Sequence, residues 1–211
     1  MGSTAPKKYY SLTELLTGAE ILEKGSTRDK LLRHGIRLFH KHGVDGTSVG
    51  RLLQATGKSK SQFYSHFRDK DDFICEVLDV QMSTMLQFIK RQPLERMADL
   101  EKWFAPYLEL ATLPQNLGCP VGPLATEMSP SHEIVRLKAV EQFDRWLDTV
   151  EEALKKLAGN EGFSPAFEPR VAARRLCCSI QGAFLFCRVY QDESFMVELR
   201  EQFRQELSAF S

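Results

Sequence analysis

The sequence predicts an all-α protein, and three observations lead to that prediction. No segment alternates apolar and polar residues over the length of a strand, whereas apolar residues recur at helical spacing almost throughout the 211 residues. Capping residues precede several of these periodic segments, and Gly or Pro residues follow them. The chain is also long enough to bury a sizeable core and to form one or two domains.

Two elements are expected before residue 47. Residues 1–26 form an N-terminal extension, with a possible extra helix in its amphipathic part, and no function is assigned to it. A helix from about residue 27 to 42 follows and ends at Gly43. Its apolar side is formed by Leu32, Ile36 and Phe39.

Residues 47–70, TSVGRLLQATGKSKSQFYSHFRDK, have the pattern of a DNA-reading helix-turn-helix. Gly57 breaks a short amphipathic helix, and Ser59 begins a second one with Gln62 at capping-box spacing. Phe63 and Phe67 of the second helix are expected to pack inward. Its other side carries side chains that can hydrogen-bond to phosphates or base edges, namely Lys60, Ser61, Gln62, Tyr64 and His66.

The charge distribution supports this interpretation better than the net charge does. The whole chain has 28 basic and 28 acidic side chains. Residues 24–70, however, hold eleven Lys and Arg against three Asp, so this segment is basic and the remainder is acidic by the same amount. A basic lobe on an acidic body is typical of a polyanion-binding module attached to a second part.

A long helix is expected to join these two parts. Asp69 caps it, and apolar residues line one side as far as Pro93. We place the domain boundary within this helix, which gives a DNA-binding domain at 27–75 and a second helical domain at 76–211.

The second domain is predicted to be helical to its end. Shorter helices occupy 94–114, a loop rich in Pro and Gly follows, and Ser129-Pro130 begins a long helix that reaches about Ala158. Its packing seam is expected at Val140, Phe143, Leu147, Val150, Leu154 and Leu157. Pro169 opens another helix, which is apolar on nearly every side from Cys177 to Tyr190. One face of that helix can pack within the monomer and the other against a second copy.

The composition excludes several classes of protein. No apolar run approaches the roughly 20 residues that span a bilayer, and no apolar region follows Lys7 and Lys8 as in a secretory signal. The five cysteines are odd in number and lack metal-binding spacing, so we expect reduced thiols in a cytoplasmic protein without a metal or cofactor.

The module from Thr27 to about Val77 resembles the DNA-binding domain of the tetracycline-repressor (TetR) family of bacterial regulators. The resemblance lies in HGIRLFHKHGVDGTSV and LLQATGKSKSQFYSHFRDKDDF, and most specifically in Phe63-Tyr64-X-His66-Phe67-X-X-Lys70. It implies an all-α homodimer that binds double-stranded DNA, with a divergent C-terminal domain for effector binding and dimerisation. By the same resemblance, Tyr64 and Lys70 contact DNA.

Several of the predicted DNA-binding residues have a second interpretation. Gln62 either pairs with adenine in the major groove or completes the capping box of Ser59. Thr47 and Ser48 either bind a phosphate or cap a helix. Tyr64 and His66 either face DNA or are satisfied within the domain. The complete predicted set is Thr47, Ser48, Lys58, Ser59, Lys60, Ser61, Gln62, Tyr64, His66 and Lys70.

A second resemblance concerns regulation. Gly118-Cys119-Pro120-Val121-Gly122-Pro123-Leu124, with Glu127, resembles the GC-X-X-G-X-L-X-X-E segment of one branch of the family, some of whose members respond to reactive or small organic molecules. Cys119 is therefore a candidate sensor, although no Lys or Arg lies near it in sequence and a buried Cys is also a common core residue. An effector pocket could be lined by Trp103, Tyr107, Cys119, Met128, Phe143, Trp146 and Phe184, which core packing would use equally well.

These features favour a DNA-binding transcriptional regulator over the other classes considered. The leading hypothesis is a homodimeric repressor that a small-molecule effector releases from a near-palindromic operator, and the alternative is a regulator that responds to electrophiles through Cys119. An enzyme is disfavoured because no catalytic, phosphate-binding or metal motif is present. An interaction module for another protein would need an exposed apolar surface beyond the dimer seam.

Overall fold

The computed structural model describes residues 22, 25–112, 119, 121–127 and 132–211, and the regular structure within these ranges is entirely helical. Most of the predicted extension at 1–26, and the predicted residues Met128, Ser129 and Pro130, lie outside the described residues. None of the described helices is long and apolar enough to cross a membrane.

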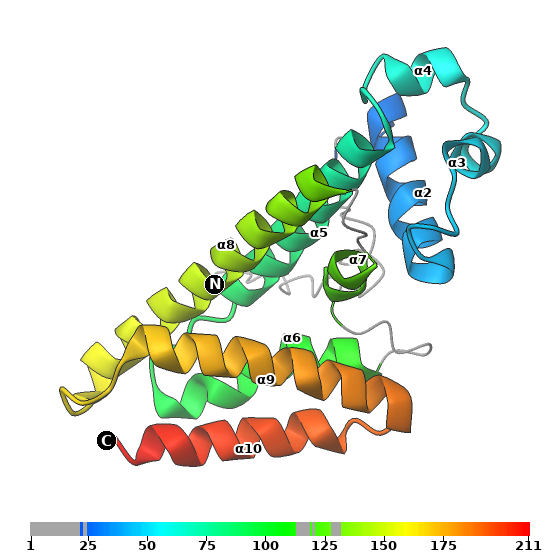
Figure 1. Ribbon diagram of the computed structural model, residues 1–211. Coiled ribbons are helices and arrows are strands. Elements are labelled where there is room, and N and C mark those ends of the chain that lie inside the picture. The colour runs from blue at the N-terminus through cyan, green and yellow to red at the C-terminus, as the bar shows by residue number, and fades with distance from the viewer. Residues whose placement is uncertain (1–21, 23–24, 113–118, 120, 128–131) are drawn as a thin grey trace, which may run out of the picture.

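The N-terminal domain contains three helices that begin and end where capping residues stand. α2 (Thr27–His42) begins after Ser26, whose side chain accepts a hydrogen bond from the Asp29 amide, and it ends at Gly43. α3 (Val49–Thr56) is followed by Gly57 in the left-handed conformation. α4 (Lys60–Tyr64) is shorter than predicted, so Phe67 lies beyond its end. This domain forms one end of the molecule in Figure 1.

Aromatic rings hold this domain together. Phe63, Phe67 and Phe73 are buried and their ring centroids lie 4.9–5.5 Å apart, and Phe39 contacts Phe73 at 5.8 Å. Gly35 of α2 faces the Phe73 ring so closely that a Cβ atom there would lie 2.3 Å from the ring. The predicted inward side of the helix-turn-helix is therefore confirmed, including Phe67.

α5 (Lys70–Lys90) connects the two parts of the molecule without a flexible linker. It begins at the predicted cap, where the Asp69 side chain accepts from the Asp72 amide, and its predicted apolar side is buried. α8 (Glu133–Glu161) runs beside it along the long diagonal of Figure 1.

The predicted packing seam of α8 is confirmed only in its C-terminal half. Val150, Leu154 and Leu157 are fully buried, but Val140 is 46% exposed. The N-terminal half buries a different face, which is formed by Val135, Ala139, Gln142 and Trp146. The sequence pattern misled because Gln142 is a buried polar residue on that face, where its side chain accepts a hydrogen bond from Arg145 at 2.6 Å.

The remaining helices form a layer across the lower part of Figure 1. They are the 3₁₀ turn η1 (Met97–Asp99), α6 (Leu100–Thr112), α9 (Pro169–Tyr190) and α10 (Ser194–Ser208), and α9 packs against both α8 and α10. The short α7 (Gly122–Thr126) lies between this layer and the N-terminal domain.

The C-terminal part of α9 is apolar on both sides, as predicted, but only one side is covered. Cys187 and Phe184 are buried, whereas Leu185, Val189 and Tyr190 are each at least 60% exposed. Its place in this apolar stretch predicts a core position for Cys178 as well, but Cys178 is exposed. Its side chain lies on the outer side of α9, because Cys177, one residue earlier, takes the inner side.

Candidate functional site

The outer side of α4 presents polar groups that have no partner within the described part of the protein. Lys60, Ser61 and His66 are exposed, and Tyr64 is 54% exposed although its ring edge contacts Phe63. Neither Lys58 nor Lys60 forms an ion pair with any described carboxylate. The hydrogen-bonding capacity of this surface is therefore available to an external partner.

The two capping residues have defined local roles. The Gln62 side-chain oxygen accepts from the Ser59 amide at 3.0 Å, and the Ser59 hydroxyl accepts from the Gln62 amide at 3.2 Å. Gln62 thus completes the capping box, which leaves only its NH₂ group free to donate. Ser48 caps α3 by accepting from the Arg51 amide at 3.1 Å, and its side chain stays exposed at the positive end of that helix.

Two predicted DNA-binding residues have partners in the turn between α2 and α3. Thr47 is 2% exposed, and its hydroxyl donates to the Gly43 carbonyl at 2.8 Å, so this hydroxyl is engaged within the domain. Lys70 is half-buried, and its Nζ donates to the Val44 carbonyl at 2.7 Å. In this arrangement the ammonium group of Lys70 supports the DNA-binding domain from within.

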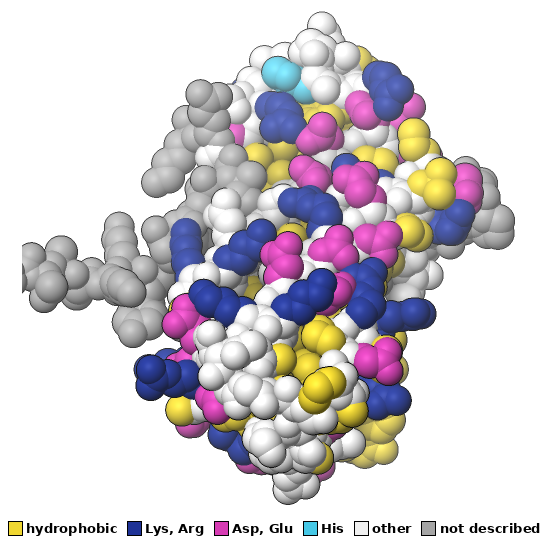
Figure 2. Space-filling view, turned by 90° about the vertical axis from the view of Figure 1, so that its left-hand side faces the viewer, with side chains coloured by type: hydrophobic (Ala, Val, Ile, Leu, Met, Phe, Trp, Pro, Cys, Tyr) yellow, Lys and Arg dark blue, Asp and Glu magenta, His cyan; other side chains and the backbone are white. Residues whose placement is uncertain are grey.

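Another part of the surface has a different electrostatic character. Figure 2 shows one side of the molecule, on which Lys and Arg lie among Asp and Glu. Charged side chains of α8 form pairs, for example Arg136 with Glu133 and Lys155 with Glu151. Such paired charges leave little net field for a polyanion, unlike the unpaired Lys60 of α4 and Lys58 just before it.

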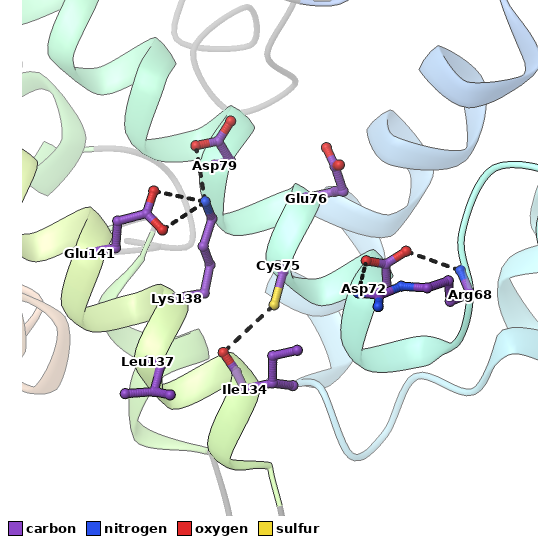
Figure 3. Close-up of a pocket in the computed structure, with 9 residues that line it drawn as sticks. All are labelled: Arg68, Asp72, Cys75, Glu76, Asp79, Ile134, Leu137, Lys138 and Glu141. Atoms are coloured by element: carbon purple, nitrogen blue, oxygen red, sulfur yellow. Dashed lines mark hydrogen bonds and ion pairs between the residues drawn. The ribbon is translucent and has the colours of Figure 1, made fainter.

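A groove of about 420 Å³ lies between the N-terminal halves of α5 and α8 (Figure 3). Its charged groups already have partners. Asp72 binds Arg68 at 2.9 Å, Lys138 lies between Asp79 and Glu141, and Glu76 pairs with Arg28. Burial raises the pKa of its thiol, that of Cys75, to about 11. A ligand would have to displace existing ion pairs to bind here.

A second cavity, of about 300 Å³, lies between α7 and α9. Phe184, Leu185 and Pro123 supply apolar surface, and Cys119 lies at its inner side. Its polar groups differ from those of the groove, because the Gln181 amide nitrogen is buried without a hydrogen-bond acceptor in the described part of the chain. Arg188 also lines this cavity, and its guanidinium pairs with no described carboxylate.

The thiol of Cys119 is poorly placed for reaction. It is 3% exposed, and burial raises its pKa, an effect that the nearby Gln181 side chain and hydrogen bonds from the Gly122 and Val121 amides only partly oppose. The Gly122 amide lies 3.3 Å from Sγ. A reactive cysteine needs a thiolate, so this environment favours the interpretation of Cys119 as a buried apolar residue.

Most of the predicted effector-pocket aromatics form a packed cluster instead. Trp103, Tyr107 and Trp146 are each at most 2% exposed, and the Trp146 indole donates to the Tyr107 hydroxyl at 3.2 Å. Phe143 packs on Trp146 with centroids 6.4 Å apart. Of the predicted residues, Cys119 and Phe184 line the cavity between α7 and α9.

Sequence reasoning missed the polar residues of this cavity, Gln181 and Arg188. They lie in the largely apolar stretch of α9. Their position as polar residues among apolar neighbours was the one feature of the sequence that could have indicated a functional role. It also assigned no role to His40, whose Nε2 lies 2.6 Å from Nε2 of Gln81. Burial and the nearby Arg188 lower the pKa of His40 to about 4.

Comparisons with known proteins match both parts of the chain. Residues 31–77 match the family model "Bacterial regulatory proteins, tetR family", and residues 93–202 match "Transcriptional regulator LmrA/YxaF-like, C-terminal domain". The chain is 27% identical over 180 residues to an HTH-type transcriptional regulator in the lacX 3′ region of Lactococcus lactis subsp. lactis, covering 82% of this chain and 89% of that protein. It is 28% identical over 169 residues to the HTH-type transcriptional repressor DhaR of Mycobacterium sp. (strain GP1), covering 77% and 82%.

Solved structures share the fold. A TetR-family transcriptional regulator from Cytophaga hutchinsonii aligns with a TM-score of 0.74 at 20% identity, covering 90% of this chain and 98% of the other. The reduced form of Escherichia coli NemR aligns with a TM-score of 0.73 at 19% identity, covering 85% and 95%. At these identities the likeness concerns the fold alone.

Proposed function

Because the chain belongs to the TetR family of bacterial regulatory proteins, we propose that it is a homodimeric transcriptional repressor that a small-molecule effector releases from its operator. The observation that carries this proposal is the surface formed by α4 and the residues just after it, where Lys60, Ser61, Tyr64 and His66 are exposed on the basic part of the chain. Side chains of this kind at the start of a recognition helix read base edges and bind phosphates. Such a regulator acts in the bacterial cytoplasm, where the chromosome is.

The uncovered side of α9 supports a dimer. Leu185, Phe186, Val189 and Tyr190 are all exposed there, and isolated monomers rarely leave such a continuous apolar surface in water. A symmetric pair of these surfaces would place two α4 helices on the same side of one DNA duplex. The expected target is a near-palindrome whose half-sites are about 34–36 Å apart.

Release by an effector follows from linkage. A ligand that binds better to the conformation in which the two recognition helices do not fit the operator must lower operator affinity by the same factor. α5 is the element that can transmit such a change, because it begins in the DNA-binding domain and packs against α8 over its length.

A footprint of the purified protein on DNA upstream of its own gene, at two salt concentrations, tests this function. We expect a protected near-palindrome and a steep loss of affinity with salt, since phosphate contacts release counterions. The Lys60→Ala variant should show a shallower salt dependence, and a Val189→Glu variant should sediment as a monomer. A salt-independent footprint, or none with wild-type protein on its own and neighbouring promoters, would contradict the proposal.

A further inference from the structure

The cavity between α7 and α9 is lined by hydrogen-bond donors that have no acceptor in the described part of the chain. Gln181 and Arg188 both line it, and both side chains carry hydrogen-bond donors. Gln181 has a buried amide nitrogen without an acceptor and Arg188 has no carboxylate partner in the described part of the chain. A buried donor without an acceptor costs about 1–3 kcal/mol, which a ligand can recover by supplying the acceptor.

The remaining surface of the cavity selects the rest of the ligand. Phe184 and Leu185 of α9 and Pro123 of α7 supply its apolar surface, and no Asp or Glu is among the described residues that line it. A cationic ligand would therefore meet no carboxylate among these described residues, and Arg188 would repel it. The volume of about 300 Å³ lies at the lower end of the range for small-molecule sites, so a ligand with about a dozen non-hydrogen atoms fits.

We propose that this cavity is the effector site and that its ligand is a small amphipathic carboxylate, whose acidic group binds Arg188 and Gln181 and whose apolar body packs on Phe184. This proposal rests on the proposed function, because it names the ligand class of the effector in that regulator. It separates this cavity from the groove between α5 and α8, whose charged side chains are already paired.

Three probes that differ only in their head group test this assignment on the free protein, without DNA. Cinnamate, cinnamamide and cinnamylamine share one apolar body and carry a negative, a neutral and a positive group. Isothermal titration calorimetry should show binding in the order cinnamate, cinnamamide, cinnamylamine, with at least a tenfold difference between the first and the last. Binding of cinnamylamine with equal or higher affinity, or no binding of any probe at millimolar concentration, would overturn the proposal.

Variants distinguish this site from any other binding surface. Arg188→Met keeps the length and apolar stem of the side chain but should remove the preference for cinnamate over cinnamamide, and Arg188→Lys should restore part of it. Gln181→Leu should weaken both. Arg174 is exposed about four turns earlier on the same helix and does not line the cavity, so Arg174→Met should bind like wild type. Because these assays contain no DNA, their failure is distinct from a failure to find an operator.

A different observation points independently to the way in which α7 contacts the DNA-binding domain. Glu127 follows α7 directly, and its carboxylate accepts a hydrogen bond from the Val44 amide at 2.5 Å across the domain boundary. Val44 is buried at the end of α2, and Lys70 holds its carbonyl at 2.7 Å. Both backbone groups of this one residue are thus bound by side chains from elsewhere.

Gly43 makes this contact possible. Its φ of 71° lies in the left-handed region, and a Cβ atom at this position would lie 2.6 Å from Oε2 of Glu127. Only glycine therefore allows the carboxylate to approach the Val44 amide. Gly122, Pro123 and Thr126 of α7 line the cavity, so the helix that contacts a ligand is followed immediately by the residue that binds the DNA-binding domain.

The geometry assigns Glu127 the role of a positioning residue, which fixes the turn between α2 and α3 and makes the orientation of α3 and α4 depend on α7. Amide hydrogen exchange at Val44, measured on the free protein by NMR, tests the contact itself. Glu127→Ala should raise that exchange rate at least tenfold, and Glu127→Gln, which keeps an acceptor oxygen, should raise it less. Glu133→Ala removes an exposed carboxylate on α8 and serves as the control.

The consequence for DNA binding is measured with the same variants. Glu127→Ala should change the operator dissociation constant at least fivefold, and cinnamate should then shift that constant less than it does in wild type. An unchanged exchange rate at Val44 would overturn the assignment even if the operator and the ligand site are correct. An unchanged operator affinity together with faster exchange would overturn the coupling and leave only a local structural contact.

Discussion

The outer side of α4 and the interior of the C-terminal domain use the same kinds of residue in opposite ways. In α4, Tyr64 and Lys60 are exposed, and their side-chain polar groups have no hydrogen-bond or ion-pair partner among the described residues. In the C-terminal domain, Tyr107 is buried and receives a hydrogen bond from Trp146, and its burial raises the pKa of its hydroxyl. The contrast teaches that unsatisfied hydrogen-bonding capacity, more than residue type, marks the surface that meets a partner.

The largest effect on stability is expected when the neighbouring residues Phe63, which is buried, and Tyr64, which is exposed, are compared. Phe63→Ala should destabilise the protein by about 3–5 kcal/mol, because it removes a buried ring from the aromatic core of the DNA-binding domain. Tyr64→Ala, one residue later, should leave the unfolding midpoint in urea nearly unchanged. Equal destabilisation by both changes would show that Tyr64 is part of the core and would remove the basis of the comparison.

The pH dependence of stability offers a second test, at the side chain of His40 on α2. Its pKa is lowered to about 4 in the folded protein from 6.5, so the folded state favours the neutral ring. The stabilisation is then complete above about pH 6.5 and is lost as the pH falls toward 4, because the unfolded state binds the proton first. At about 1.36 kcal/mol per pKa unit this amounts to about 3 kcal/mol.

Chemical denaturation at pH 7 and pH 4.5 measures this effect. The loss of unfolding free energy between the two values should be smaller in His40→Gln than in wild type. His34, a partly exposed residue of the same helix whose ring contacts the Lys30 carbonyl, provides the matched control in His34→Gln. Identical pH dependence in wild type and His40→Gln would refute the assignment.

The effect on recognition is expected to be smaller in free energy and specific to DNA. Tyr64→Ala should weaken operator binding by about 1–3 kcal/mol, the free energy that the loss of one specific base contact costs. Dimerisation should be retained. Fluorescence anisotropy with a labelled operator measures the affinity, and circular dichroism checks that helicity is unchanged.

The smallest effect is expected at Cys119. Because burial raises the pKa of this thiol, it should react with N-ethylmaleimide more slowly than the exposed Cys178, and mass spectrometry of short labelling times measures both rates. Cys119→Ser should accordingly leave any response to electrophiles unchanged. Faster labelling of Cys119 than of Cys178 would revive the thiol-sensing alternative.

The sequence predicted the DNA-binding part more fully than the C-terminal part, and the reason is physical. The helices of the former are short, close together in the chain and marked by capping residues such as Ser59 and Asp69, whose roles are local. The capping-box role, one of the two interpretations of Gln62, could be read from the sequence because its partner lies three residues away. The roles of Thr47 and Lys70 could not, since their partners are carbonyl groups of a turn whose position depends on tertiary packing.

The cavity could not be predicted because its walls come from segments far apart in the chain. Cys119 and Gln181 lie 62 positions apart in sequence and meet only when α7 packs near α9. Helical periodicity also fails where a polar residue is buried, as with Gln142 in the seam of α8. A pattern of apolar residues reports which side is buried, but not which polar group is left without a partner there.

The close contact between Gly35 of α2 and the Phe73 ring, here called the notch at Gly35, has a consequence for exchanging DNA-binding domains between related regulators. Phe73 fills this notch from α5, so the first turn of that helix belongs to the same packed unit as α2. In a hybrid regulator joined before residue 73, α2 and Phe73 would come from different proteins. The Phe73 ring would then face a helix that was not shaped to receive it, and the two halves would fit poorly. A graft that carries residues through Val77 keeps both surfaces together and can transplant the operator preference intact.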